Sequence, residues 1–464
     1  MSSYLRRALA RTRSAEVPGP DFAAGPPPEP YGEPLPVPPA LDRLLRLSLA
    51  GGRLRPVPSA GALHPVETRL LLGAGLGVRP GRYGYDPGRH LLLGLGGAPD
   101  PVPRGGAFAL LGARPERTVS HYGHRGWPLV LLDVGHAAAG LVTAARAAEG
   151  APAAGSPAPA WCVGASFAGD PAKGMRFPLA AVRLTGDGEL RAGELRDGKL
   201  RDAEFWNGEL REAELRDGEL REAELRDGEL RGGELRDRAA EPEERPDDGA
   251  PGDLAEARRV LGEVAGARGA EWIRARARPP AATSPPLRRR SADPGEIGSG
   301  APPPNRETLL AVLEAAEAVC PADGPRWCLA VGGRDAPGLI GTEHGAPRTL
   351  ATGEVLPTLA VWAAGQGWLT GAGAVLLAYG CPRDAGPARI RRDHLLAGHA
   401  VGHAQLAAAA LGTASRPVGS WQRADLGAAL GGEPGRDWVI HGLALGRRRT
   451  PAAAPRTTTG EETS

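Results

Sequence analysis

The segment Arg55–Glu67, Arg-Pro-Val-Pro-Ser-Ala-Gly-Ala-Leu-His-Pro-Val-Glu, holds the residues best suited to chemistry. Three prolines and a glycine impose an irregular backbone. Ser59, His64 and the main-chain amides of Ser59–Leu63 are expected to converge on a group lying against this loop. A rigid loop that offers small donors suits a flat cofactor with polar edges. The alternative is a proline-rich surface loop without a ligand.

Two arginine runs could bind an anion: Arg288-Arg289-Arg290-Ser291 and Gly446-Arg447-Arg448-Arg449. A guanidinium donates two parallel hydrogen bonds, which suits a phosphate, although basic runs can also be merely solvated. Acid–base candidates occur in Ser-His-Tyr-Gly-His-Arg-Gly-Trp, residues 120–127. His121 and His124 suit this task because histidine titrates near neutral pH, and Tyr122 stands between them.

The string Pro-Ser-Ala-Gly-Ala-Leu-His-Pro, followed by Gly81-Arg-Tyr-Gly-Tyr-Asp-Pro87, resembles the SagB-type (McbC-like) branch of the nitroreductase family. These are FMN-dependent dehydrogenases that oxidise azolines to azoles in ribosomally made peptides such as thiopeptides. The resemblance implies that the loop contacts the flavin and that the two arginine runs bind its phosphate. It also implies that the turn Arg416-Pro-Val-Gly419 lies beside the flavin. The FMN-binding candidates are Pro58, Ser59, Ala60, Gly61, Leu63, His64, Arg288, Arg289, Arg290, Ser291, Arg416, Gly419, Arg447 and Arg448.

One departure from the family concerns the catalytic base. Family members carry a Lys-Tyr pair shortly before the helix that contains Asp-x-Gly-His. Here the corresponding residues are Arg125-Gly126-Trp127-Pro128, without lysine or tyrosine. Tyr122, His124 or His121 would then have to supply the base.

The elements that position these residues occur twice. Gly135-His136-Ala137 and Gly398-His399-Ala400 each open a predicted apolar helix that ends in glycine. Amphipathic helices are predicted upstream, at Leu41–Leu49 and Glu307–Val319, and strands downstream, at Phe177–Leu184 and Trp438–Leu445. The same order at nearly one offset indicates a duplicated module, with boundaries at 38–186 and 285–450.

Each module has only half of a site. The second module's counterpart of the loop, Pro321–Arg326, lacks the serine, and the first module's last strand ends at Arg183–Asp187 without an arginine run. We therefore expect an α+β protein whose tandem nitroreductase-like modules form an intramolecular pseudo-dimer. It would have one functional flavin site, composed from the first module's loop and the second module's arginines.

Residues 187–284 separate the modules. From Glu189 to Asp237 a five-residue unit recurs, mostly Gly/Ala-Glu-Leu-Arg-Asp/Glu. A five-residue period does not keep leucines on one face of an α-helix, but it resembles the pentapeptide repeats that form a square β-helix. A solvated, charge-alternating linker is the preferred interpretation. Leu254–Arg276 could form a solvated helix.

Composition narrows the function classes. A net charge of +2 argues against a nucleic-acid binder, and four cysteines without a Cys-x-x-Cys pair suggest neither a metal site nor disulfides. No signal peptide or membrane span is predicted, so a cytoplasmic protein is expected. The predicted function is FMN-dependent oxidation of thiazoline or oxazoline rings in a precursor peptide, beside a cyclodehydratase partner, with a homo-oligomer also conceivable. The alternatives are an NAD(P)H-dependent nitro- or quinone reductase and a catalytically degenerate scaffold.

Overall fold

The computed structural model describes residues 2–24, 32–95, 102, 104–149, 160–164, 175–185, 252–269, 271–273, 290–298, 303–333, 337–343 and 346–447. The five-residue repeat between Glu189 and Asp237 lies outside these ranges, as do Arg288, Arg289, Arg448 and Arg449. The predicted module boundaries and the interpretation of the repeat therefore stay predictions.

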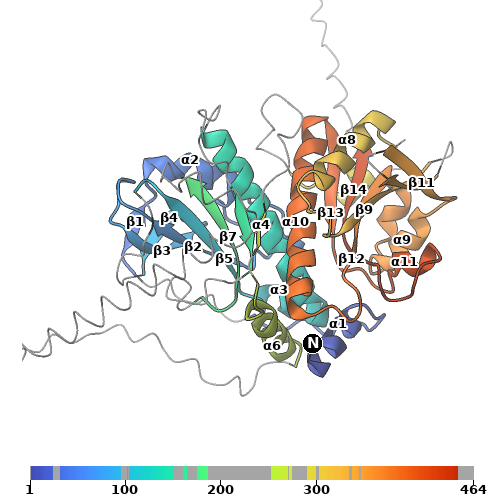
Figure 1. Cartoon of the computed structure of the whole chain (residues 1–464), viewed down its shortest axis with the longest axis horizontal. Helices are drawn as coiled ribbons and strands as arrows, with labels where there is room; N and C mark the ends of the chain where they lie inside the picture. Colours follow the sequence, from blue (N-terminus) through green and yellow to red (C-terminus); the bar gives the residue numbers. More distant parts are fainter. Residues whose placement is uncertain are drawn as a thin grey trace, which may run out of the picture.

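The described residues form two antiparallel sheets (Figure 1). The first has the strand order β1-β4-β3-β2-β5-β7-β6-β8 and the second has the order β11-β10-β9-β12-β14-β13. The strands of the first sheet are β1 (Pro34–Pro36), β2 (Val66–Leu72), β3 (Gly81–Asp86), β4 (Leu91–Gly94), β5 (Ala107–Ala113), β6 (Trp161–Val163), β7 (Pro178–Thr185) and β8 (Glu271–Ile273). Those of the second are β9 (Arg326–Val331), β10 (Gly338–Glu343), β11 (Ala346–Thr352), β12 (Ala374–Gly380), β13 (Thr413–Val418) and β14 (Trp438–Arg447).

The two sheets repeat one topology. The order β4-β3-β2-β5-β7-β6 in the first matches β11-β10-β9-β12-β14-β13 in the second, strand for strand, and every pairing is antiparallel. Only the edge strands β1 and β8 have no counterpart. The duplication inferred from the sequence is thus present in the fold.

Helices lie between and around the sheets. The longest, α4 (Gly126–Glu149) and α10 (Pro387–Ala410), run side by side between the two sheets and carry most of the contact between the halves (Figure 1). The other helices are α1 (Ser3–Thr12), α2 (Pro39–Ser48), α3 (Glu116–Tyr122), α6 (Gly252–Ala265), α7 (Pro294–Ile297), α8 (Arg306–Glu317), α9 (Leu356–Trp362) and α11 (Leu426–Ala429), with short 3-10 turns η1 (Ala60–Ala62), η2 (Gly123–Arg125) and η4 (Gly367–Gly371).

Two expectations about helices were wrong. The paired helices begin at Gly126 and Pro387, not at the Gly-His-Ala motifs, so Asp133 and His399 lie in helix interiors whose amides bond within the helix. The sequence misled because polar residues inside a buried helix look like a start signal. The second error is α6, which was expected to be solvated. Leu254, Ala257 and its other apolar residues are buried, because α6 packs against α1, α3, α4 and α10.

One helical stretch, Glu116–Ala148, is long and apolar enough to cross a membrane by length and composition. However, 89% of its most apolar window is buried inside the protein. Its position between the two sheets accounts for that apolar character, since α4 is in contact with protein on all sides, including α10, α2 and β7.

Candidate functional site

The loop before β2 has a strained backbone. Gly61 has a φ of 59°, and two residues other than glycine, Ala62 and His64, also lie in the left-handed region at 55° and 50°. A non-glycine residue in this region costs free energy, so its surroundings must hold it there. Strain of this kind concentrates in loops that position a ligand or a reacting group.

Asp133 on α4 holds the loop in place. The Ser59 hydroxyl donates a 2.6 Å hydrogen bond to the Asp133 carboxylate, and the Ala60 amide donates to the same group at 3.2 Å. Ser59 Oγ in turn accepts from the His64 amide at 2.9 Å. One buried carboxylate therefore organises both ends of the turn.

These bonds correct the expectation that the amides of Ser59–Leu63 and the Ser59 hydroxyl face a ligand. The amides of Ala62 and Leu63 also bond within the turn, to the carbonyls of Ser59 and Ala60. The turn is so tight that these amides and the Ser59 hydroxyl bond to protein and are not available to a ligand. Within the described segment Ser59–His64, the amides of Ser59 and Gly61 are the two that make no hydrogen bond to protein, and Gly61 is exposed.

The pKa of Asp133 is raised to about 7, chiefly because burial disfavours its charged form. The hydrogen bonds from Ser59 and Ala60 act in the opposite direction, since they stabilise the carboxylate. The side chain is 4% exposed. The loop is thus attached to a group that changes charge near neutral pH.

Of the three candidate bases, only Tyr122 lies at the loop. A Cβ built on Gly61 would be 3.1 Å from the Tyr122 hydroxyl oxygen. His121 points away, within 2.9 Å of the Asp21 carboxylate, and His124 is fully buried with Nδ1 4.0 Å from Glu16. Both histidines therefore face the N-terminal segment and not the loop, and the sequence could not show this orientation.

The environment of Tyr122 keeps it protonated. Burial raises the pKa of its phenol, and the nearby Asp133 carboxylate raises it further. The Arg416 guanidinium, from the second half of the chain, lowers the pKa of the same phenol and so lies within electrostatic reach. Tyr122 also bears on the expected departure from the family. Because α4 starts at Gly126, a tyrosine does precede this helix, four residues earlier.

The second half contributes the polar residues Arg416, Ser291 and Gln405. Arg416 on β13 donates a 2.9 Å hydrogen bond to the carbonyl of Ala292, whose amide donates to Ser415 O. The Gln405 side-chain amide on α10 donates to Ser291 Oγ at 3.4 Å, which brings Ser291 to the same region. The neighbouring turn lies against α4, because a Cβ on Gly419 would be 2.4 Å from Leu129 Cδ2.

Tyr122 therefore lies beside the first half's loop and within electrostatic reach of Arg416 from the second half. Other candidates lie less centrally or outside the described residues. Arg290 is exposed and binds Glu296, Arg447 ends β14, where it pairs with Thr413, and Arg288, Arg289 and Arg448 are not described. Pro58 lines the small pocket behind the loop.

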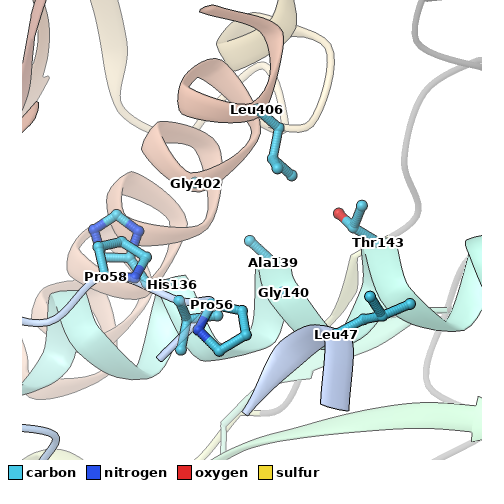
Figure 2. A pocket seen from close by; sticks show the side chains of 10 residues that line it. Leu47, Pro56, Pro58, His136, Ala139, Gly140, Thr143, Gly402 and Leu406 are labelled. Carbon is cyan, nitrogen blue, oxygen red and sulfur yellow. The ribbon is translucent and has the colours of Figure 1, made fainter. Parts of the chain in front are cut away.

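That pocket lies between the loop, α4 and α10, and has a volume of about 20 Å³. Figure 2 shows Ala139 and Thr143 of α4 and Leu406 of α10 pointing into it. His136 lines one end, with its Nε2 atom 2.9 Å from His441 Nε2 on β14. The space suits about one water molecule, so no organic ligand fits behind the loop as it stands.

Sequence reasoning missed two residues of this site. Neither Asp133 nor Gln405, whose Oε1 is buried without a hydrogen-bond partner in the described part of the chain, was among the predicted site residues. The sequence did hold a signal for Asp133, because it is an acidic residue within an otherwise apolar helix. Among the described residues, no group of three His, Cys, Asp or Glu side chains could hold a metal ion.

Comparisons with known proteins give the fold a family context. No family model and no curated protein matches the sequence. A candidate nitroreductase from Anabaena variabilis superposes on 97% of this chain and on 100% of its own, with a TM-score of 0.59 and 17% identity. A likeness at this identity shows the fold alone, and it confirms the expected nitroreductase-like α+β architecture.

Two further solved structures match only partly. A candidate nitroreductase from Desulfovibrio desulfuricans, in complex with FMN, covers 36% of this chain and 84% of its own at 22% identity, with a TM-score of 0.25. Nitroreductase A from Vibrio parahaemolyticus covers 35% of this chain and 70% of its own at 16% identity, with a TM-score of 0.24.

Proposed function

We propose that the protein is an FMN-dependent oxidoreductase with one composite flavin site. The observation that carries the proposal is that Tyr122 lies beside a strained loop of the first half and within electrostatic reach of Arg416 from the second half. The duplicated fold supports it, because a pseudo-dimer can build one site from two different halves.

The residues present suit an FMN. The exposed Gly61 amide and the Tyr122 hydroxyl are donors for the polar edge of a flavin ring. Arg416 and Ser291 are suited to its phosphate, because a guanidinium and a hydroxyl both donate hydrogen bonds. Because the pocket behind the loop holds only about 20 Å³, the group would lie over the exposed side of the loop.

The narrower proposal is the oxidation of thiazoline or oxazoline rings in a ribosomally made peptide, and it rests on the loop sequence Pro58–Pro65 with Gly81–Pro87. Bound FMN would supply the redox chemistry by accepting a hydride. The ring must also lose a proton. Tyr122 lies beside Gly61, on the side of the loop where a substrate would bind. Asp133 has a pKa of about 7 but is buried beneath the loop, so it would accept the proton through the Ser59 hydroxyl that donates to it.

A second candidate has its own support. Tyr122 stays protonated near neutral pH, and a protonated phenol suits proton donation during the reduction of a substrate. This favours the alternative of an NAD(P)H-dependent nitro- or quinone reductase. A degenerate scaffold is the outcome if flavin does not bind at all. The dehydrogenase proposal also includes a cytoplasmic location, an azoline-containing peptide as substrate and a cyclodehydratase as partner.

The first experiment is the visible absorption spectrum of the purified full chain, with flavin released and counted. One FMN per chain supports the composite site. Anaerobic addition of an azoline peptide, and separately of NADPH, then shows which substrate bleaches the flavin. A colourless protein that FMN cannot reconstitute refutes both enzyme proposals.

A further inference from the structure

A second pocket, distinct from the loop, contains two arginines. It lies where α1 and the start of α4 meet β14, and its volume is about 40 Å³. Its polar lining comes from Thr12, Arg13, Arg125, His394 and Ser420, while leucine, proline, isoleucine and valine side chains and Trp421 form the other walls. None of the residues of the Pro58–His64 loop borders it.

Arg13 is the central group. Its Nη2 atom donates a 2.7 Å hydrogen bond to the Cys381 carbonyl, and its guanidinium carbon lies 5.1 Å from the centre of the Trp438 ring. Its Nη1 atom is buried and has no hydrogen-bond partner among the described residues. A buried N–H that makes no bond costs free energy, and on a cation the cost is larger.

The carboxylates nearest to Arg13 are already engaged. Asp393 binds Arg389 at 2.7 Å, and Asp425 accepts hydrogen bonds from the amides of Ala428 and Gly435. Burial lowers the pKa of Arg13, and the Cys381 thiol, followed by Asp425 and Asp393, offsets only part of that effect. The protein therefore supplies no contact carboxylate to this cation within the described ranges.

Among the described residues, the acceptors that face Arg125 are neutral. Its Nη2 atom donates to the main-chain carbonyl of Glu16 at 2.5 Å, and the side-chain amide of Gln422 faces its guanidinium. The carboxylate of Glu16 binds Arg11 at 2.6 Å instead. Arg13 and Arg125 thus line one small pocket. The neighbouring acids Glu16 and Asp393 pair with Arg11 and Arg389 instead.

Strained backbone surrounds Arg13. Cys381, whose carbonyl accepts from Arg13, has a φ of 51°, and Arg423, whose amide donates to the Arg13 carbonyl, has a φ of 50°. Ser420, in the pocket lining, has a φ of 65°. Such conformations persist where contacts fix them. Cys381 and Arg423 bond to Arg13, and Ser420 lines the pocket beside it.

We propose that this pocket binds a small monovalent anion, of the size of bromide or formate, against the guanidinium groups of Arg13 and Arg125. The volume exceeds what one water needs but excludes a nucleotide or a sugar phosphate. The bound anion offers an acceptor to Arg13 Nη1 and compensates the buried charge. It thereby fastens α1, at the start of the chain, to the second sheet.

The test is the unfolding of the full-length protein in bromide or formate against gluconate, at constant ionic strength. An anion present at ten times its dissociation constant should lower the apparent unfolding equilibrium constant about tenfold. Arg13→Met should abolish this response. The matched control is Arg7→Gln, which removes an exposed arginine from the same helix and should leave the response intact.

A direct measurement covers the case in which Arg13→Met does not fold. Crystals of the wild-type protein soaked in bromide should show an anomalous scattering peak beside Arg13 Nη1. Arg125→Gln should weaken that peak. An equal bromide response in wild type and Arg13→Met, or an empty pocket in crystals at saturating bromide, would overturn the proposal.

Discussion

Gly135 on α4 and Gly398 on α10 make reciprocal contacts where the two long helices cross. A Cβ added to Gly135 would lie 2.3 Å from the Leu395 carbonyl oxygen, and one added to Gly398 would lie 2.2 Å from the Leu132 carbonyl oxygen. Each glycine thus meets the backbone three residues before its counterpart. Contacts that exchange in this way define a two-fold interface, here within a single chain.

The first prediction concerns this crossing. Gly398→Ala should lower the free energy of unfolding by about 3 kcal/mol, because the new methyl group would force two packed backbones apart. Chemical denaturation measures the change. Gly252→Ala is the control, since a Cβ there meets nothing within 4 Å, and it should change stability by less than about 0.5 kcal/mol. Equal effects of the two substitutions would contradict the close crossing.

Much of the fold could be predicted from the sequence, because a duplicated module shows each helix and strand pattern twice. Apolar periodicity gave α2, α8, β7 and β14 to within a few residues, and the repeated Gly-His-Ala motif revealed the pair of central helices. The helix starts were not accessible. Both central helices begin about ten residues before the motif, in segments whose buried polar residues, such as Arg391, make the periodicity ambiguous. Tertiary contacts, not local pattern, set those boundaries.

The second prediction is a pH dependence of Asp133. Its folded-state pKa of about 7 exceeds the unfolded value of 3.8, so the folded state binds the proton more tightly. The stability contributed by this group is therefore complete below pH 4 and is lost as pH rises through 7, by about 4 kcal/mol in total. In Asp133→Asn this loss disappears, so the variant should gain stability relative to wild type between pH 4 and 7.

Urea unfolding of both proteins across this pH range measures the difference. The control is Asp384→Asn, which changes an exposed carboxylate and should run parallel to wild type. If the difference between Asp133→Asn and wild type is constant with pH, the carboxyl group titrates normally and is not buried as described.

The third prediction concerns acid sensitivity at the interface between the halves. Burial lowers the pKa of His441 to about 3 and that of His403 to about 3, below the unfolded value of 6.5. Their contribution to stability is present above pH 6.5 and is lost as pH falls toward 3, because the unfolded chain binds the protons first. Stability should therefore decline with acid from about pH 6.5.

His441→Gln isolates one of these protons. The slope of unfolding free energy against pH between 4 and 6 should fall by about 1.4 kcal/mol per unit, which corresponds to one proton fewer taken up on unfolding. His121→Gln, at a 54% exposed side chain, should leave the slope unchanged. An unchanged slope in His441→Gln would show that His441 is solvated.

The candidate site was less predictable than the fold. The sequence directed attention to the loop through its prolines and glycine, and to Arg416 through the family resemblance, and both stay predictions as flavin-binding groups. It could not place His121 and His124, which turn toward Asp21 and Glu16 in a segment at least 100 residues away. It also could not show that the Ser59 hydroxyl donates its hydrogen bond to Asp133 and is therefore not free for a ligand. Side-chain direction depends on long-range packing, which no local motif encodes.

The fourth prediction tests whether one composite site exists. Arg416→Gln should reduce FMN retention at least tenfold, because it removes the half-buried cation closest to Tyr122 and the bond to the Ala292 carbonyl. Equilibrium dialysis against free FMN measures this loss. The matched control is Arg326→Gln in the second half, where the serine-containing loop has no equivalent. Arg326 pairs with Asp437 and stacks on Tyr379, so its loss should cost some stability but no flavin. Two flavins per wild-type chain, or equal losses in both variants, would show that the halves carry separate sites and that the composite arrangement is wrong.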